Sequence, residues 1–273
     1  MAISEKNKTL TIGIPVHNGS KYIEKRIIEI QNAVKCDYRI IISDNFSDDK
    51  TQEICKKFLS NKNITYYRQN RNIGVIENFK FLINMCKTKY FVFASVDDVW
   101  DLNFIDDNIK LLKENKAAVA FSNFYISDKR TKKKIPIYVT PSVSNSSFVR
   151  LLTRVIDPVP HIIYGVIDLD FYKIDMLKNM DFFDIYFTFA LSLSGKVIVS
   201  NKFSYQWQVD GYRKSYSIIS KEVSGLKFFF NTLGLVKKFS LLKKLFLIIL
   251  LFRWTIINLF KRKFSPNYYD VKF

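Results

Sequence analysis

The sequence predicts an α/β protein in which helices flank a mostly parallel central sheet. Three features of the sequence support this fold class. Apolar runs of strand length alternate with amphipathic runs of helical spacing through the first half of the chain. The apolar runs are rich in β-branched and aromatic residues, which favour strands. With 273 residues, 48% of them hydrophobic, the chain can bury a sizeable core.

The first half is predicted as five strands joined by four helices. Each strand is a short apolar run, and each intervening segment carries apolar residues at helical spacing. The strands are expected at 10–16, 38–43, 64–68, 90–96 and 117–126, and the helices at 20–34, 48–60, 74–86 and 101–115. Alternation of this kind predicts a parallel sheet with ligands at the carboxyl ends of its strands.

The second half gives different signals. Residues 127–147 are basic and contain proline and serine, which predicts a mobile loop or insertion. Residues 182–194 have the composition of a helix that Gly195 ends, and a short strand is expected after it. In 226–264 the longest uninterrupted apolar run is Leu245–Phe252. A bilayer span needs roughly 20 apolar residues, so an amphipathic helix lying in the membrane plane fits better.

The charge of the chain implies an anionic partner. The sequence has 43 Lys and Arg against 25 Asp and Glu, a net charge of +18, which suits a nucleic acid, a phosphorylated substrate or an acidic membrane. No acid lies between Glu222 and Asp270, whereas 227–263 contains nine basic residues, half of the net charge. Residues 226–264 are therefore predicted to bind an anionic membrane surface. The alternative is a helical bundle packed on the core.

The cysteines and the N-terminus favour the cytoplasm. Cys36, Cys55 and Cys86 have no CxxC spacing, so we expect buried thiols in a reducing compartment. The first ten residues lack the apolar stretch of a secretory signal.

Polar residues cluster where three predicted strands end. His17 and Asn18 follow the first strand, Asp44 ends the second, and Asp97 and Asp98 follow the fourth. The carboxyl ends of parallel strands can share one edge, where one carboxylate would take base or ribose donors and another would hold a metal for a diphosphate. Taken singly, each acid is more often a turn or a helix cap.

These strand ends carry a family resemblance. The runs "IGIPVHNGSKYIEK", "IIISDNFSDDKT", "NRNIGVIENF" and "SVDDVW" resemble, in order, the nucleotide-sugar half of the family 2 glycosyltransferases, which have the GT-A fold. The resemblance covers about 9–126 and continues more loosely to about 201. It implies transfer from a nucleotide-activated sugar, with a UDP-sugar as the expected donor and Mg²⁺ or Mn²⁺ as cofactor. The positions expected to bind the nucleotide-sugar are Pro15, Val16, His17, Asn18, Asp44, Asn72, Gly74, Asn78, Ser95, Val96, Asp97 and Asp98.

The metal-binding stretch departs from the family pattern at one position. Relatives commonly have aspartate where this chain has Ser95. One carboxylate can suffice, because the diphosphate and waters supply the other ligands. We therefore expect the metal on Asp97, with Asp98 supporting it or the sugar hydroxyls. The alternative is that the two acids only cap the helix that begins near Leu102.

Inverting transfer also needs a general base near the acceptor hydroxyl. The resemblance places it just before a helix with a glycine-terminated turn, where Asp184 is the leading candidate and Asp181 competes with it. His161 is a candidate for contact with the substrate, although a histidine beside an apolar strand is usually structural. Arg213 or Lys214 could bind phosphate, and solvated loop charges are the alternative.

The predicted domains follow from these assignments. Residues 1–220 form the GT-A domain, with a nucleotide-sugar half at about 9–126 and an acceptor half at about 148–220, and 221–273 form the membrane-association segment. The expected acceptor is lipid-linked or belongs to another surface glycan, on the inner face of a bacterial membrane. The rivals are a nonenzymatic scaffold with a decayed transferase fold and a nucleic-acid binder. No nucleic-acid motif occurs, and no GxGxxG follows the first strand.

Overall fold

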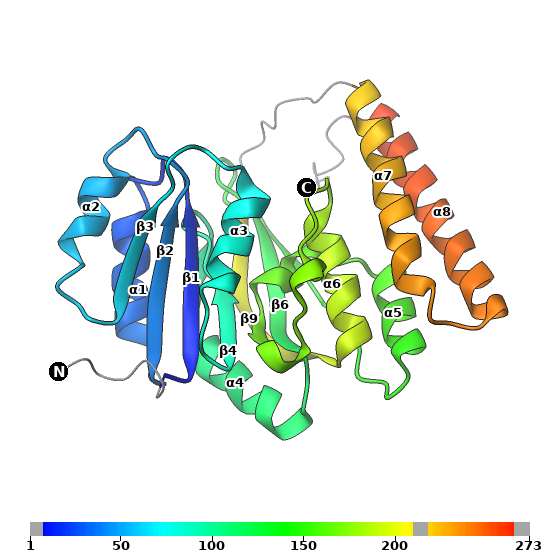
Figure 1. The fold of residues 1–273 in the computed structure, drawn as a ribbon, viewed down its shortest axis with the longest axis horizontal. Helices are drawn as coiled ribbons and strands as arrows, with labels where there is room; N and C mark the ends of the chain where they lie inside the picture. Colours follow the sequence, from blue (N-terminus) through cyan, green and yellow to red (C-terminus); the bar gives the residue numbers. More distant parts are fainter. Residues whose placement is uncertain (1–7, 210–217, 265–273) are drawn as a thin grey trace.

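The computed structural model describes residues 8–209 and 218–264. Its described strands form one nine-stranded sheet in the order β3-β2-β1-β4-β8-β6-β9-β5, with β7 paired to β6. Helices lie on both sides of this sheet (Figure 1). The predicted fold class, a central and mostly parallel sheet flanked by helices, is confirmed.

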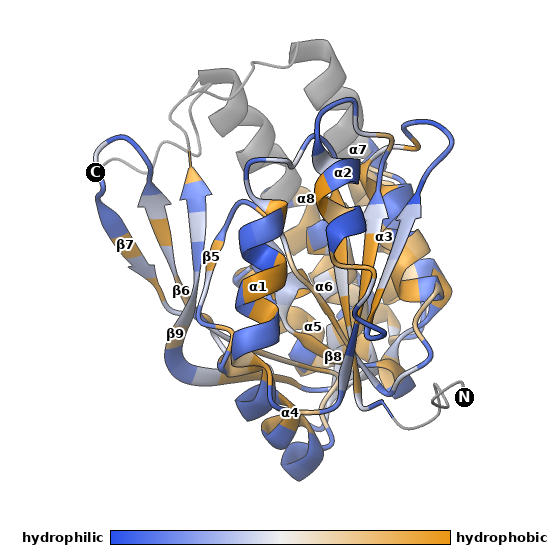
Figure 2. Cartoon of the chain, turned by 90° about the vertical axis from the view of Figure 1, so that its left-hand side faces the viewer, coloured by the Kyte–Doolittle hydropathy of each residue, from blue (hydrophilic) through white to orange (hydrophobic). Residues whose placement is uncertain are grey.

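The first half supplies the parallel part of the sheet. Leu10 of the first strand pairs in parallel with Tyr38 of the second strand on one side and with Tyr90 of the fourth on the other. The third strand pairs in parallel with the second, so all four strands run in the same direction. Hydrophilic and hydrophobic residues alternate along α1 (Figure 2), and its buried residues include Ile23, Ile27 and Ile30. The elements are β1 (Leu10–Val16), α1 (Ile23–Ala33), β2 (Tyr38–Asp44), α2 (Thr51–Lys57), β3 (Ile64–Arg68), α3 (Val75–Asn84), β4 (Tyr90–Phe93) and α4 (Phe104–Asn115).

The second half extends the sheet with mixed directions. β6 pairs parallel with β9, whereas β8 is antiparallel to β4 and to β6. The two-residue β5 pairs with β9 and so ties the end of the first half to the second. The elements are β5 (Val99–Trp100), β6 (Val119–Asp128), β7 (Lys134–Ile137), α5 (Ser147–Ile156), η2 (Pro160–Tyr164), β8 (Val166–Asp168), η3 (Leu169–Phe171), η4 (Ile174–Met176), α6 (Phe183–Ser194) and β9 (Val197–Val209).

The segment predicted as a mobile loop or insertion, 127–147, contains a short β-hairpin that the sequence analysis does not predict. β6 runs on to Asp128 and turns back into β7, forming a hairpin. The Asp128 carboxylate closes the turn by accepting from the backbone N–H groups of Arg130 (2.7 Å) and Thr131 (3.0 Å). The strand after Gly195 is also longer than expected, because β9 has 13 residues.

The C-terminal segment is two helices rather than one. α7 (Ile218–Val236) and α8 (Leu241–Phe264) lie side by side, next to α5 and α6 (Figure 1). Their inner faces are buried, and their outer faces expose leucine, isoleucine and phenylalanine side chains. Over 227–253, where the side chains of this helical hairpin are described, the buried ones are Phe228, Thr232, Val236, Leu247 and Leu251. In the part of the chain that the structure describes, no helix combines the length and hydropathy that crossing a bilayer requires.

Candidate functional site

The turns after β1 and β2 are bonded to each other. Asn18, which has a positive φ of 53°, donates its backbone N–H to the Ser47 hydroxyl (2.9 Å). The Gly19 N–H donates to the Thr51 hydroxyl (2.9 Å), and the Ser20 N–H to the Asp49 carboxylate (3.0 Å). The first turn is therefore held by side chains of the second, which fixes the relative position of two of the predicted strand ends.

Asp49 is the acid that makes this connection. Burial alone would raise the pKa of its carboxyl, but hydrogen bonds from Thr51 and Ser20 outweigh burial and hold the pKa well below its usual range. Asp49 therefore stays ionised in its structural role and is not a candidate for proton transfer.

Asp44, the predicted base-contacting acid, is fully buried at the end of β2. Its carboxylate accepts from the Ser47 N–H (2.8 Å) and the Tyr66 hydroxyl (2.6 Å), and the Arg68 Nε lies 3.9 Å away. Burial and the neighbouring carboxylate raise the pKa of Tyr66. Both oxygens of Asp44 thus already have partners, so a nucleotide base would share them with Ser47 and Tyr66.

The predicted "NxG" turn lies beside the other strand ends. The Asn72 Oδ1 accepts from the Asn45 side chain (3.0 Å) and from the Gly74 N–H (2.9 Å), and its Nδ2 lies 3.5 Å from the His17 ring. Gly74 has a φ of +83°, a conformation that favours glycine. The structure therefore brings His17, Asn72 and Gly74 together, as the resemblance implies.

Asn78 is also predicted to bind the nucleotide-sugar, but it lies within a helix and not in a turn. It is buried in α3, where its Oδ1 accepts from the Ser43 hydroxyl (2.5 Å) and its Nδ2 donates to the Ser43 carbonyl (3.0 Å). This pair of bonds fastens α3 to β2. Asn78 thus stabilises the packing of α3 against β2.

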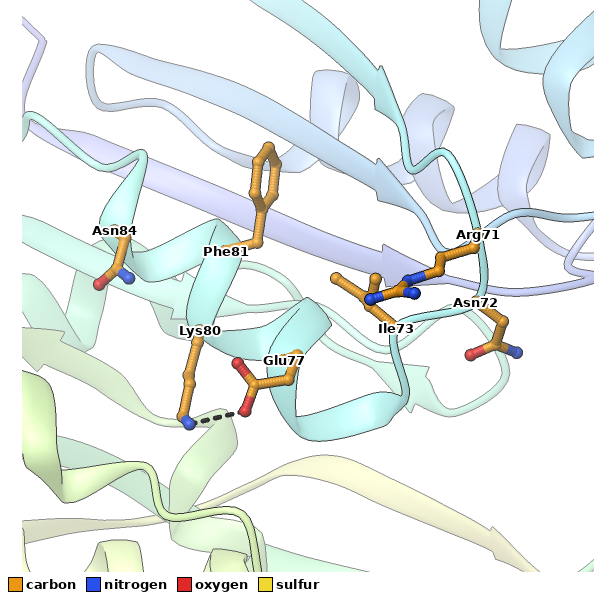
Figure 3. Close-up of a pocket in the computed structure, with 7 residues that line it drawn as sticks. All are labelled: Arg71, Asn72, Ile73, Glu77, Lys80, Phe81 and Asn84. Atoms are coloured by element: carbon orange, nitrogen blue, oxygen red, sulfur yellow. Dashed lines mark hydrogen bonds and ion pairs between the residues drawn. The ribbon is translucent and has the colours of Figure 1, made fainter.

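A groove of about 630 Å³ adjoins this turn. Figure 3 shows it along one side of α3, where Lys80 points toward Glu77 and the two form an ion pair of 2.7 Å. Phe81 forms part of its wall and packs edge-on against Tyr67 of β3 (5.3 Å between ring centroids). The lining residues are Arg71, Asn72, Ile73, Glu77, Lys80, Phe81 and Asn84.

The two acids that follow β4 differ in their surroundings. Asp98 is buried, and its carboxylate accepts from the Ser95 hydroxyl (2.7 Å), the Tyr205 hydroxyl and the Gln208 N–H (3.0 Å). Burial raises the pKa of Asp98, although these hydrogen bonds act in the opposite direction. Asp97 is exposed, and no group in the described chain donates to its carboxylate. Hydrogen-bond donors thus stabilise one acid of the pair and leave the other open.

The departure at Ser95 has a structural explanation. A serine hydroxyl can donate to Asp98, whereas an ionised aspartate at that position would only accept and would add repulsion. A cation also lies close by, because the buried Arg26 of α1 donates to the Asp98 backbone carbonyl and pairs with Glu29 (2.9 Å). Burial lowers the pKa of Arg26, which the acids Glu29, Asp98 and Asp97 oppose.

The residues present fit a metal held by a single carboxylate. Among the described residues no group of three or more His, Cys, Asp or Glu side chains could hold an ion. Asp97 has free oxygens, whereas those of Asp98 are occupied by Ser95, Tyr205 and Gln208. An oxygen-preferring Mg²⁺ or Mn²⁺ would therefore depend on the donor diphosphate and water for its other ligands.

Tyr164 and Tyr205, which the sequence reasoning missed, join the acid pair to the second half. Their rings stack at 5.6 Å, and Trp100 packs edge-on against both. His161 belongs to the same cluster, 4.6 Å from the Phe124 ring. His161 is half-buried and packs against these rings, and its contact with the substrate stays a prediction. The aromatic alternation of β9 was the available signal for Tyr205, but not for its partner, which lies 107 residues away.

Asp184 lies in the first turn of α6, where its carboxylate accepts from the Ile185 N–H (2.8 Å). Burial raises the pKa of Tyr164, and the charges of Asp98, Asp184 and Asp97 raise it further. Asp181 is exposed just before the helix. Arg213 and Lys214 lie outside the described residues.

TarS of Staphylococcus aureus is among the solved structures that this chain resembles. TarS 1-349 aligns with a TM-score of 0.67 at 15% identity and covers 97% of this chain and 75% of that chain. The same protein in complex with UDP-GlcNAc aligns with a TM-score of 0.63 at 14% identity, over 86% of this chain and 69% of that one. These likenesses confirm the GT-A-like fold.

Sequence comparison agrees with this fold. The chain is 24% identical over 123 residues to glycosyltransferase GlyG of Streptococcus pneumoniae (45% of this chain, 41% of that protein). It is 35% identical over 89 residues to abequosyltransferase RfbV of Salmonella typhimurium (31% of this chain, 27% of that protein). The chain thus spans less than half the length of these relatives. Residues 11–167, more than half of the chain, match the sequence model of "Glycosyl transferase family 2". The chain therefore belongs to glycosyltransferase family 2.

Proposed function

We propose that this protein is an inverting glycosyltransferase that moves a sugar from a UDP-sugar to a hydroxyl of a lipid-linked or other surface-glycan acceptor. The observation that carries the proposal is the packing of the start of α6 against β4, through the rings of Phe183, Phe79 and Phe93, because α6 carries Asp184 and β4 leads to Asp97. An open carboxylate for the donor and a candidate base for the acceptor thus belong to one region. The solved TarS complexes with UDP and UDP-GlcNAc support the choice of donor for testing.

The donor would bind along the three bonded strand ends. Val16, His17 and Asn72 offer the nucleoside a preformed edge, and Asp44 offers a carboxylate whose orientation Tyr66 fixes. Because these groups are bonded to one another before the donor arrives, little ordering is required on binding.

Asp97 would hold a Mn²⁺ or Mg²⁺ ion together with the donor diphosphate, and such an ion neutralises the charge on a departing diphosphate. On the acceptor side, Asp184 would take the proton of the attacking hydroxyl. The hydroxyl would then displace the nucleotide from the opposite face of the anomeric carbon, which inverts the configuration.

The first experiment is a calorimetric titration of UDP into the full chain, with and without Mn²⁺. We expect Mn²⁺-dependent binding in the wild type, loss of binding in Asp97→Ala, and unchanged binding in Asp175→Ala, a matched loss of an exposed acid elsewhere. Metal-independent binding would refute the metal assignment and turn attention to basic residues such as Arg213. Absence of binding to UDP, dTDP, GDP and CMP would favour the nonenzymatic scaffold.

The candidate base is tested by hydrolysis of UDP-sugars with water as acceptor. We expect Asp184→Asn to lower turnover by about 10²-fold or more, because a general base contributes 10²–10⁴-fold. Asp181→Asn is the matched variant three residues away. If both variants kept full turnover, Asp184 and Asp181 would both be excluded as the base.

The outer face of the hairpin supports peripheral membrane binding. Leu242, Leu245 and Ile249 are exposed at helical spacing on α8, with exposed fractions of 80%, 48% and 64%. The two helices also expose lysines and an arginine, and each basic residue near an anionic leaflet contributes about 1 kcal/mol of attraction. Over 227–253, where side-chain burial is described, the exposed basic residues are Lys227, Lys237, Lys238, Lys243 and Arg253. We therefore propose that α8 lies in the surface of the inner leaflet.

Flotation with vesicles tests this placement. The wild type should float with phosphatidylglycerol vesicles and less with phosphatidylcholine vesicles. The double substitution Leu245→Glu with Ile249→Glu should abolish flotation, while Ile174→Glu, at an isoleucine that is 69% exposed on another surface, should leave it unchanged. Equal flotation of all three proteins would exclude α8 as the membrane contact.

A further inference from the structure

The residue before α6 has an unusual backbone conformation. Phe182 has φ 60° and ψ 28°, the left-handed region that bulky side chains rarely adopt. It lies between the two candidate bases, Asp181 and Asp184, in the sequence. Its conformation therefore decides the direction in which the chain enters α6 and where both carboxylates point. A conformation of this kind persists only where the surrounding packing holds it.

The packing that holds Phe182 comes from the C-terminal hairpin. The ring of Phe228, on α7, lies edge-on to the Phe182 ring with 5.6 Å between centroids. Phe228 has no exposed surface, and it also contacts Phe189 on the second turn of α6 (6.2 Å). A single α7 side chain thus touches both the residue that starts α6 and the body of that helix.

The next residue, Phe183, is held by the nucleotide-sugar half of the chain (about 9–126), which is called the donor half below. The Phe183 ring lies edge-on to Phe79 of α3 (5.8 Å), and Phe79 packs on Phe93 of β4 (4.5 Å). Phe93 is two residues before Ser95, in the strand that leads to the acid pair. The start of α6 is therefore held between the donor half on one side and the hairpin on the other.

We infer that the C-terminal hairpin is part of the catalytic unit, with Phe228 acting through Phe182 as a positioning residue for the candidate base. This inference rests on the proposed function. Phe228 touches no substrate; it fixes the cap of α6, and the cap fixes Asp184. The hairpin thus has two separate faces, an inner one that orders the base and the outer one proposed for lipid.

The inference can be tested on the full chain with three substitutions. Phe228→Ala removes the ring, Phe228→Leu keeps an apolar side chain there, and Phe230→Ala is the matched control, since Phe230 lies on the same helix and is 65% exposed. The Tyr186 amide donates to the Phe182 carbonyl (3.0 Å), so its hydrogen exchange reports on the cap without any assay of activity. UDP-sugar hydrolysis and UDP affinity are measured alongside.

In Phe228→Ala we expect exchange at Tyr186 to accelerate by about tenfold or more, because the cap opens locally. Hydrolysis should fall by about 10²-fold, as expected for a misplaced catalytic group, while the Kd for UDP stays within about twofold of the wild type because the strand ends of the donor half are untouched. Phe228→Leu should lie between, and Phe230→Ala should match the wild type in all three measurements.

Unchanged exchange at Tyr186 in Phe228→Ala would overturn the inference, as would exchange that accelerates equally in β1 to β4. If Phe228→Ala does not fold, Phe228→Leu decides on the same criteria. Wild-type protein that hydrolyses no UDP-sugar would count against the proposed function, and exchange at Tyr186 would still decide the Phe228 contact.

Discussion

Replacing Tyr66 by phenylalanine should remove one hydrogen bond from a fully buried carboxylate. The Tyr66 hydroxyl donates to Asp44 at 2.6 Å, and the substitution leaves Asp44 with the Ser47 amide at 2.8 Å and the Arg68 guanidinium at 3.9 Å. A hydrogen bond to a charged group contributes about 1.5–3 kcal/mol. Because Tyr66 is half-buried and water reaches it in part, we expect the free energy of unfolding to fall by about 2 kcal/mol.

This loss should be visible in both denaturant and thermal unfolding. With roughly 2.1 cal/mol/K of unfolding entropy per residue, a chain of 273 residues has about 0.57 kcal/mol/K, so Tm should fall by about 3–4 °C. Tyr67→Phe is the matched control, because the Tyr67 ring packs on Phe81 and its hydroxyl makes no hydrogen bond in the described chain. Its stability should change by less than about 0.5 kcal/mol. Equal losses in the two variants would refute the reasoning.

Three other substitutions in the turns that follow the parallel strands should each lower the stability for a different physical reason. Ser95→Asp should lower the free energy of unfolding in urea by about 2–3 kcal/mol, because it removes a donor from Asp98 and adds a like charge beside it. Asp49→Asn should lose stability relative to the wild type at pH 7. Hydrogen bonds outweigh burial and depress the folded-state pKa of Asp49, so its contribution is present above the unfolded value of about 4 and is lost as pH falls through the folded value. Urea unfolding at pH 7 and pH 3 would therefore show a smaller difference at pH 3. Gly74→Ala should cost about 1–3 kcal/mol, since φ is +83° and ψ is 163° there, a conformation essentially restricted to glycine, while no atom lies within 4 Å of the added methyl group.

The sheet edge proposed to bind the donor could be predicted from the sequence, because each polar residue on it lies close in sequence to the strand that positions it. Each strand end is followed at once by its polar residues, and the parallel order of β1, β2 and β4 brings Asn18, Asp44 and Asp97 to the same edge. In the first half of the chain, the spacing of apolar residues distinguishes helices from strands. The polar residues that hold the turns together, such as Ser47 and Thr51, lie within the same short motifs.

The surroundings of Asp98 could not be predicted, because its partners come from distant positions. Tyr205 and Gln208 lie more than one hundred residues along the chain, and Arg26 lies 72 residues before it. No periodicity relates such positions. Two adjacent acids therefore suggested a shared metal, whereas the structure gives hydrogen-bond donors to Asp98 and leaves Asp97 open.

For the helical hairpin of α7 and α8, the sequence does not show which apolar residues are buried. An apolar stripe has the same spacing whether it packs on lipid or on a protein core. Phe228 and Phe230 both belong to the apolar part of α7, yet one is buried and the other is 65% exposed. The basic and proline residues of 127–147 are typical of a loop or insertion, and they conceal the four-residue β7 strand within it.

The long separation between Asp98 and β9 also has a consequence for the order of events during synthesis. Strands β1 to β4 leave the ribosome first, and their parallel pairing needs nothing beyond Phe93. Asp98 gains Tyr205 and Gln208 only after β9 has been made and has paired with β5. Contacts of such long range form late, because a large loop must close first. A nascent chain would therefore form the strand ends that carry Asn18 and Asp44 early, and the hydrogen bonds of Asp98 only near the end of translation. An incomplete chain would then have the strand ends proposed to bind the nucleotide, but its Asp98 would lack Tyr205 and Gln208 as partners.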